Sequence, residues 1–227
     1  MLDLGAESTH PDSEAVPAEI EVERLGPLVA SLKPIGARLS IDTRKPAVMA
    51  AMLALGVDVI NDVNGLASEE AISVVAPSSA RVVVMHSVQS SAGRAGRPET
   101  TPAEIVGRIT AFFAERVETL QRAGVALERV ILDPGMGFFL GVDPLVSVEV
   151  LRKLGEFRRI GCELLISVSR KSFIGALIDR EAPPPAKDRG AASLAAELWA
   201  LAQGVDHIRT HAVRELRDAA RVWTALA

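Results

Sequence analysis

Short apolar runs alternate with longer amphipathic stretches along almost the whole chain. The short runs are rich in Val, Ile and Leu and are bounded by Gly, Pro or polar residues, which predicts buried strands. The predicted strands are Leu2–Leu4, Arg38–Ile41, Val57–Ile60, Arg81–Met85, Arg129–Leu132, Glu163–Val168 and His207–Ile208. The predicted helices are Ala18–Leu32, Pro46–Leu55, Pro102–Ala123, Pro144–Phe157, Ala191–Gln203 and Val213–Leu226. This alternation predicts a parallel sheet covered by helices.

Two folds fit such a sheet, a doubly wound sheet and a closed barrel. The strands are continuously apolar, as expected when both faces are covered. Nearly every strand ends in a polar residue, which favours the barrel, because there the carboxyl ends of all strands converge on one rim. Neither a glycine-rich dinucleotide fingerprint nor a phosphate-loop motif is present to support the doubly wound sheet. We therefore predict a TIM-type (β/α)₈ barrel, with residues 1–227 forming a single domain.

Composition and charge exclude several function classes. Of the 227 residues, 48% are hydrophobic and 24% are charged, which is typical of a globular protein. The net charge of −4, without a basic block, argues against nucleic acid as a partner. Cys162 is the one cysteine, which excludes an intrachain disulfide and a cysteine-based metal cluster. The sequence has no membrane-length apolar run and no secretory signal pattern, so we expect a cytoplasmic protein without a membrane partner.

Two carboxylates and an amide end three of the apolar runs. They are Asp42, Asn61 and Asp133, and each alone is most simply a strand cap. Lys171 follows the most apolar strand and would point over the barrel mouth. Together the four side chains offer acceptors and donors that suit a flat heterocycle with amino, ring NH and carbonyl groups on one edge.

Arg209 and His211 are two residues apart after the last predicted strand. Residues at that spacing share a face of a strand, so a guanidinium and an imidazole would form an anion site. The alternative is that Arg209 pairs with a rim carboxylate and His211 caps the last helix, and both interpretations stay open. His86 is interpreted as a structural histidine at a strand end.

Eight short segments, in one order along the chain, are similar to segments of bacterial dihydropteroate synthase. The segments are Asp-Leu-Gly-Ala-Glu-Ser-Thr (3–9), Ser-Ile-Asp-Thr (40–43), Val-Ile-Asn-Asp-Val (59–63), Val-Met-His (84–86), Leu-Asp-Pro-Gly-Met-Gly-Phe (132–138), Ser-Arg-Lys-Ser-Phe-Ile (169–174), Ala-Ser-Leu-Ala (192–195) and Ile-Arg-Thr-His (208–211). Each segment alone is a weak indication, but the ordered set is specific. The chain thus resembles this family over essentially its whole length.

The resemblance implies a (β/α)₈ barrel that condenses 6-hydroxymethyl-dihydropterin pyrophosphate with 4-aminobenzoate. Pterin binding is implied for Asp42, Asn61, Met85, Asp133, Lys171 and Arg209. Contact with pyrophosphate or aminobenzoate is implied for Thr9, His10, Phe138, Ser172, Arg209 and His211. Catalysis is implied for Lys171, Arg209, His211 and Asp133. Mg²⁺ as cofactor and a homodimer through the last helices are implied as well.

Some positions depart from the family pattern. The family's barrel begins with one more strand–helix unit, so we expect this chain to lack the first unit of the barrel. His10 stands where the family usually has arginine, and Ala212 stands where it has aspartate. The alternatives are a methyltetrahydrofolate-binding methyltransferase domain and a non-catalytic pterin-binding paralogue. The segments at 169–173 and 209–211 favour the synthase over the methyltransferase.

Overall fold

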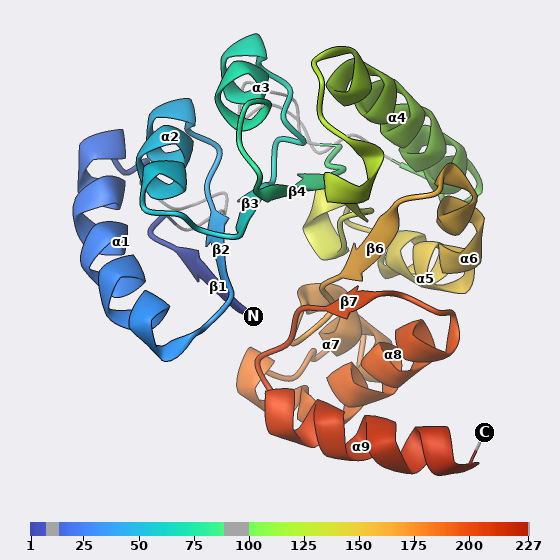
Figure 1. The fold of residues 1–227 in the computed structure, drawn as a ribbon. Coiled ribbons are helices and arrows are strands. Elements are labelled where there is room, and N and C mark those ends of the chain that lie inside the picture. Colours follow the sequence, from blue (N-terminus) through green and yellow to red (C-terminus); the bar gives the residue numbers. More distant parts are fainter. Residues whose placement is uncertain (8–13, 89–99, 227) are drawn as a thin grey trace. The chain divides into compact units, whose positions relative to one another are not determined.

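The computed structural model describes residues 1–7, 14–88 and 100–226. They form two compact units, one of Met1–Met85 with Phe113–Leu132 and one of His86–Phe112 with Asp133–Ala227. Strands and helices alternate along the chain in both units (Figure 1). Helix α4 (Pro102–Arg122) contributes residues to each. No helix in the described part of the chain is long and apolar enough to cross a membrane.

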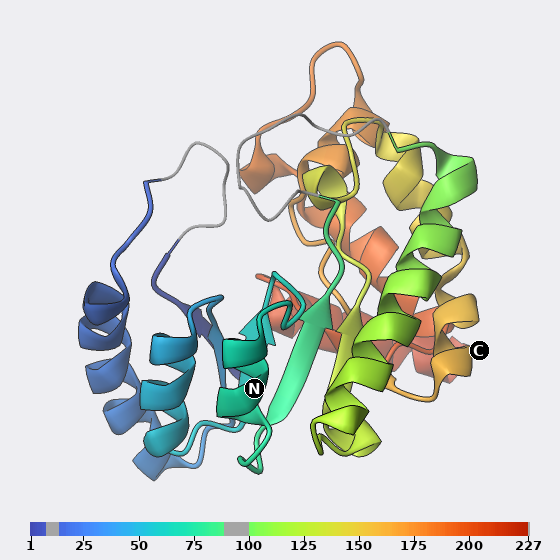
Figure 2. The same ribbon diagram turned by 90° about the horizontal axis from the view of Figure 1, so that it is seen from above.

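The first unit is a parallel sheet flanked by helices. Its strands are β1 (Leu2–Gly5), β2 (Leu39–Asp42), β3 (Val59–Asp62), β4 (Arg81–Met85) and β5 (Val130–Asp133). The strands lie in sequence order, and the pairs β1–β2, β2–β3 and β3–β4 are parallel. The helices are α1 (Ala18–Leu32), α2 (Pro46–Ala54) and α3 (Glu69–Val75). They lie along one side of the strands (Figure 2). Because the strands are parallel, their carboxyl ends share one edge of the sheet.

Local sequence explains where these helices begin and which face they bury. Leu25 and Val29 of α1 are four residues apart and are both buried against the sheet side. Pro46 occupies the first turn of α2, where its missing N–H is not needed. The Ser68 hydroxyl accepts the Ala71 N–H at 3.1 Å and so caps α3.

The second unit carries the last two strands. Strands β6 (Glu163–Ile166) and β7 (His207–Ile208) pair in parallel. Its further helices are α5 (Pro144–Arg152), α6 (Leu154–Phe157), α7 (Ser172–Ile178), α8 (Gly190–Ala202) and α9 (Val213–Leu226). Helix α5 packs against α7 and α8, and α8 packs against α9.

Two of the differences between the structure and the predicted helices have a plain physical reason. A continuous helix over 144–157 was predicted, but the helix ends at Arg152 because Lys153 leaves helical geometry (φ −109°, ψ 13°). The break lets Leu154 and Phe157 turn inward, and both side chains are fully buried. Helix α3 was not predicted, because a seven-residue helix is too short to display a clear apolar period.

Candidate active site

In the first unit, Asp42 and Asn61 lie at the carboxyl ends of neighbouring strands, as predicted. They are register partners, so their side chains leave the sheet on the same face. The Asn61 side-chain amide donates to Oδ2 of Asp3 at 3.1 Å, and Asn61 is buried. Sequence reasoning did not assign Asp3 to the site, and the structure adds this carboxylate to the group. Met85, which ends β4, is buried as well.

A buried ion network holds the loop after β2. The Nζ of Lys45 pairs with Glu7 and with Glu21, and Glu21 is only 1% exposed. The Thr43 hydroxyl donates to the second oxygen of Glu21 at 3.0 Å. Burial alone would lower the pKa of Lys45, but the hydrogen bonds and charges of the two glutamates raise it above its ordinary value. The charged network therefore anchors the chain immediately after Asp42.

In the second unit, a glycine turn fixes the carboxylate of Asp133. Oδ1 of Asp133 accepts the Gly135 N–H at 2.8 Å, and Asp133 is 5% exposed. Gly135 has φ +70°, and a Cβ there would lie 2.3 Å from the backbone oxygen of His86. Only glycine fits that turn, so the orientation of Asp133 is determined by the backbone.

Lys171 lies against the same turn. Its Nζ donates to the Met136 carbonyl at 3.2 Å and lies 4.9 Å from the centroid of the Phe139 ring. Phe138 stacks on Phe139 with ring centroids 4.9 Å apart. Ser172 is exposed at the first turn of α7. The second unit thus gathers Asp133, Phe138 and Lys171 around one turn, and Ser172 is the residue that follows Lys171.

Arg209 and His211 follow β7, and both are exposed. Nδ1 of His211 lies 3.1 Å from the hydroxyl of Ser169. Burial and then the positive charges of Arg170 and Arg209 lower the pKa of His211. Two guanidinium groups, of Arg170 and Arg209, therefore lie close enough to His211 to affect the charge of its imidazole. Thr9 and His10, two further predicted site residues, lie outside the described residues.

His86 is buried, which agrees with its interpretation as a structural histidine. It is 5% exposed, and its ring meets Phe112 edge-on with centroids 5.2 Å apart. Burial lowers the pKa of His86 to about 4, although a hydrogen bond to the Pro134 backbone opposes the shift. The residue is therefore neutral at pH 7.

We expect His86 to make the free energy of unfolding fall between pH 7 and pH 4.5. An unfolded histidine takes up a proton near pH 6.5, whereas folded His86 resists protonation to about 4. The stability contribution is present above pH 6.5 and decreases as the pH falls, by about 2–3 kcal/mol at pH 4.5.

Protonation of Asp62 changes the free energy of unfolding in the opposite direction. Asp62 must therefore be substituted before the contribution of His86 can be measured alone. Burial raises the pKa of Asp62 to about 6, so its stability contribution is present below its unfolded value and is lost as pH rises through 6. Urea unfolding of Asp62→Asn at both pH values should show the full decrease, and the Asp62→Asn/His86→Gln double variant should lack it. Equal decreases in the two variants would contradict the assignment to His86.

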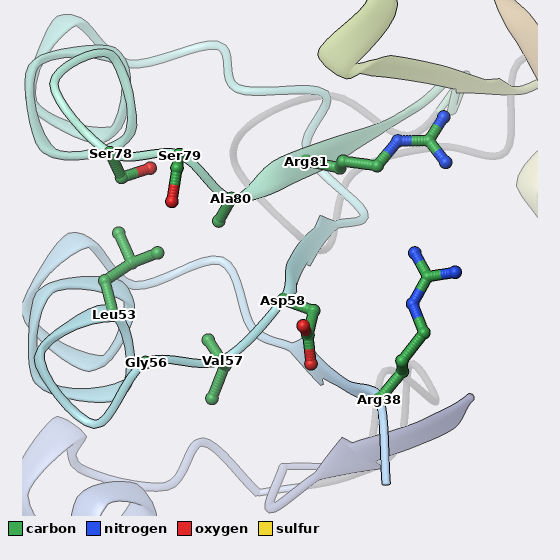
Figure 3. Close-up of a pocket in the computed structure, with 9 residues that line it drawn as sticks. All are labelled: Arg38, Leu53, Gly56, Val57, Asp58, Ser78, Ser79, Ala80 and Arg81. Atoms are coloured by element: carbon green, nitrogen blue, oxygen red, sulfur yellow. The ribbon is translucent and has the colours of Figure 1, made fainter. Parts of the chain in front are cut away.

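A cavity of about 490 Å³ lies at the opposite, amino ends of β2–β4 (Figure 3). Arg38 and Arg81 extend on the same side of it, and Asp58 lies between the strands that carry them. Asp58 already accepts the Leu39 N–H at 2.8 Å. None of the predicted site residues is among its described lining residues. Because residues at the amino ends of barrel strands mainly serve stability, we do not assign this cavity to catalysis.

Comparison with known protein families and solved structures identifies the family of this chain. The model of the family described as pterin binding enzyme matches residues 1–211. The chain belongs to this family. A type-2 dihydropteroate synthase of Escherichia coli is 44% identical to this pterin binding enzyme over 227 residues, which is all of the chain and 82% of the relative. A type-3 dihydropteroate synthase of the same organism is 42% identical and 84% covered.

Solved structures confirm the predicted fold class of this pterin binding enzyme. Burkholderia cenocepacia dihydropteroate synthase complexed with 7,8-dihydropteroate has a TM-score of 0.90 and 38% identity, covering 99% of this chain and 80% of the other. The Xanthomonas albilineans enzyme with 4-aminobenzoic acid has a TM-score of 0.88 and 36% identity, covering 99% of this chain and 78% of the other. The family resemblance is confirmed by the same findings.

Proposed function

We propose that this protein is a dihydropteroate synthase. It condenses 6-hydroxymethyl-7,8-dihydropterin pyrophosphate with 4-aminobenzoate to give 7,8-dihydropteroate and pyrophosphate in folate biosynthesis. Relatives of that name align with the whole chain, and solved relatives contain 4-aminobenzoate or dihydropteroate. The observation that carries the proposal is the turn that holds a buried carboxylate, Asp133, and a cation, Lys171, in segments that resemble the family.

The pterin is recognised along its polar edge. Asp42, Asn61 and Asp133 accept from or donate to the ring amino, NH and carbonyl groups, and Lys171 donates to a ring acceptor. Buried polar groups discriminate strongly, because a ligand that fails to match them leaves them without a hydrogen bond. Met85 packs against one face of the ring.

Pyrophosphate departure is the step that the cationic residues assist. As the C–O bond to the exocyclic methylene breaks, the electron pair leaves with pyrophosphate, and Arg209 and His211 stabilise that developing charge. The aminobenzoate nitrogen then forms the new C–N bond and releases one proton. Because an aniline nitrogen is already nucleophilic, no strong base is required. Thr9, His10, Phe138 and Ser172 are assigned to the aminobenzoate and pyrophosphate region.

Magnesium enters this proposal with the substrate. No group of three or more potential His, Cys, Asp or Glu ligands occurs among the residues that the structure describes. Mg²⁺ is commonly bound by substrate phosphates together with only one or two protein carboxylates. We therefore propose that the ion arrives with the pyrophosphate of the substrate. When bound, the ion would neutralise phosphate charge, and the steps above depend on the chain's own residues.

We further propose a cytoplasmic homodimer that forms through the last helices. None of the described residues of α9 is buried. Val213 is 67% exposed, Val222 62% and Trp223 43%, which leaves apolar surface on one helix. A second copy of the chain would cover this surface.

Turnover tests the proposed function against its two alternatives. Purified protein, pterin pyrophosphate, 4-aminobenzoate and Mg²⁺ should yield dihydropteroate, measured by chromatography. Pterin binding without product would indicate the non-catalytic paralogue. Binding of 5-methyltetrahydrofolate in preference to the pterin pyrophosphate would indicate the methyltransferase domain, and either outcome would contradict the proposal.

A further inference from the structure

A buried glutamate lies beneath the histidine that follows β7. Glu197 is on α8 and is 1% exposed, and its carboxylate hydrogen-bonds the hydroxyls of Ser169 and Thr210. Ser169 follows β6 and Thr210 follows β7, so three elements of the second unit meet at this carboxylate. Burial raises the pKa of Glu197, and the two hydrogen bonds oppose that shift.

The carboxylate determines where each hydroxyl hydrogen points. When Glu197 is ionised, its carboxylate only accepts hydrogen bonds, so Ser169 and Thr210 donate to it and present lone pairs to the loop. Ser169 Oγ accepts the His211 backbone N–H at 3.3 Å and lies 3.1 Å from Nδ1 of that ring. Thr210 Oγ1 accepts the Ala212 N–H at 3.1 Å. The hydroxyls of Thr210 and Ser169 lie 3.4 Å apart, which is long for a hydrogen bond between two hydroxyl groups.

We propose that Glu197 is a positioning residue that, through Ser169, holds His211 in the tautomer with its hydrogen on Nδ1. Because Nδ1–H donates to Ser169, Nε2 is the nitrogen that meets a ligand. The inference rests on the proposed function, in which His211 binds pyrophosphate. A neutral Nε2 carries a lone pair, so it must take up a proton before it can donate to a phosphate oxygen. Pyrophosphate binding is therefore linked to proton uptake at His211.

The charged groups around His211 determine the pH range of this linkage. Burial and then the charges of Arg170 and Arg209 lower the pKa of His211, and Glu197 is connected to its ring through the Ser169 hydroxyl. On α9, Arg214 and Glu215 are exposed to solvent. The lowered pKa makes unliganded His211 mainly neutral at pH 7.5, so pyrophosphate affinity should rise as the pH falls toward 6.

Nitrogen-15 NMR of protein that contains ¹⁵N-labelled histidine shows directly which ring nitrogen carries the hydrogen. Wild-type His211, assigned by comparison with His211→Asn, should carry its hydrogen on Nδ1 at pH 8. Glu197→Gln should lose this preference, because an amide donates to Ser169 as well as accepting from it. Ser169→Ala should have the same effect, and the double variant should add nothing. A wild-type ring with its hydrogen on Nε2 would overturn the positioning role, whether or not the variants fold.

Calorimetric titration with inorganic pyrophosphate and Mg²⁺ supplies the second readout. Between pH 6 and pH 8, the affinity of Glu197→Gln should change less with pH than that of the wild type, because a neutral ring with its hydrogen on Nε2 can donate to a phosphate oxygen without taking up a proton. Glu156→Gln is the matched control, because this glutamate is exposed and pairs with Lys153 at the surface. Wild-type affinity and pH profile in Glu197→Gln would overturn the inference. Absence of pyrophosphate binding to the wild type would instead contradict the proposed function.

Discussion

Replacing Asp133 with asparagine is expected to weaken pterin binding about 10- to 100-fold while the protein stays folded. The amide oxygen of asparagine can still accept the Gly135 N–H, which Oδ1 of Asp133 accepts at 2.8 Å. The amide NH₂ group then replaces the second carboxylate oxygen and faces ring NH donors. Mismatched buried polar groups cost about 1–3 kcal/mol, which corresponds to this range of affinity. Calorimetry with the pterin substrate measures the effect.

Asp143→Asn is the matched control for this substitution. Asp143 caps α5 by accepting the Leu145 N–H at 3.1 Å in an exposed hydrogen bond. We expect pterin affinity to stay within twofold of the wild type in this variant. If a folded Asp133→Asn protein binds the pterin with wild-type affinity, Asp133 is not a pterin-binding residue.

Lys45→Met is expected to lower the free energy of unfolding by about 3 kcal/mol, because a buried carboxylate loses its ionic partner. Glu21 is 1% exposed and accepts the Thr43 hydroxyl at 3.0 Å, but it would lose the ammonium group that neutralises its charge. Urea denaturation at pH 7.5 measures the effect.

Two further variants separate the buried pair from a general effect of losing a cation. Lys45→Met/Glu21→Leu should recover most of the stability, because the second substitution removes the buried charge. Arg122→Met breaks a surface pair with Glu118, in which both side chains are at least 65% exposed, and should cost less than about 1 kcal/mol. Similar losses in Lys45→Met and Arg122→Met would contradict the role assigned to the buried network.

The sequence was sufficient to predict the strands and the rim residues, for a physical reason. Parallel strands buried on both faces are continuous apolar runs, so their polar ends are conspicuous. Asp42, Asn61 and Asp133 were found in this way. Lys171 and His211 were found because they follow such runs directly, and the ordered motifs identified the family.

The supporting residues could not be predicted, because tertiary packing alone reveals them. Glu197 lies in an amphipathic helix, where a glutamate normally faces solvent, and only the convergence of α8 with the loops after β6 and β7 buries it. The pairing of Glu21 with Lys45 joins residues 24 positions apart. The contact of Asp3 with Asn61 spans 58 positions and depends on sheet register.

A single-turnover reaction measures directly whether the protein condenses the pterin pyrophosphate with 4-aminobenzoate. Protein in excess is mixed with pterin pyrophosphate, labelled 4-aminobenzoate and Mg²⁺, and labelled dihydropteroate and free pyrophosphate are counted in the same sample. We expect one pyrophosphate for each labelled dihydropteroate, with a slower reaction in Asp133→Asn and an unchanged one in Asp143→Asn. Release of pyrophosphate without labelled dihydropteroate, or no reaction in the wild type, would contradict this expectation.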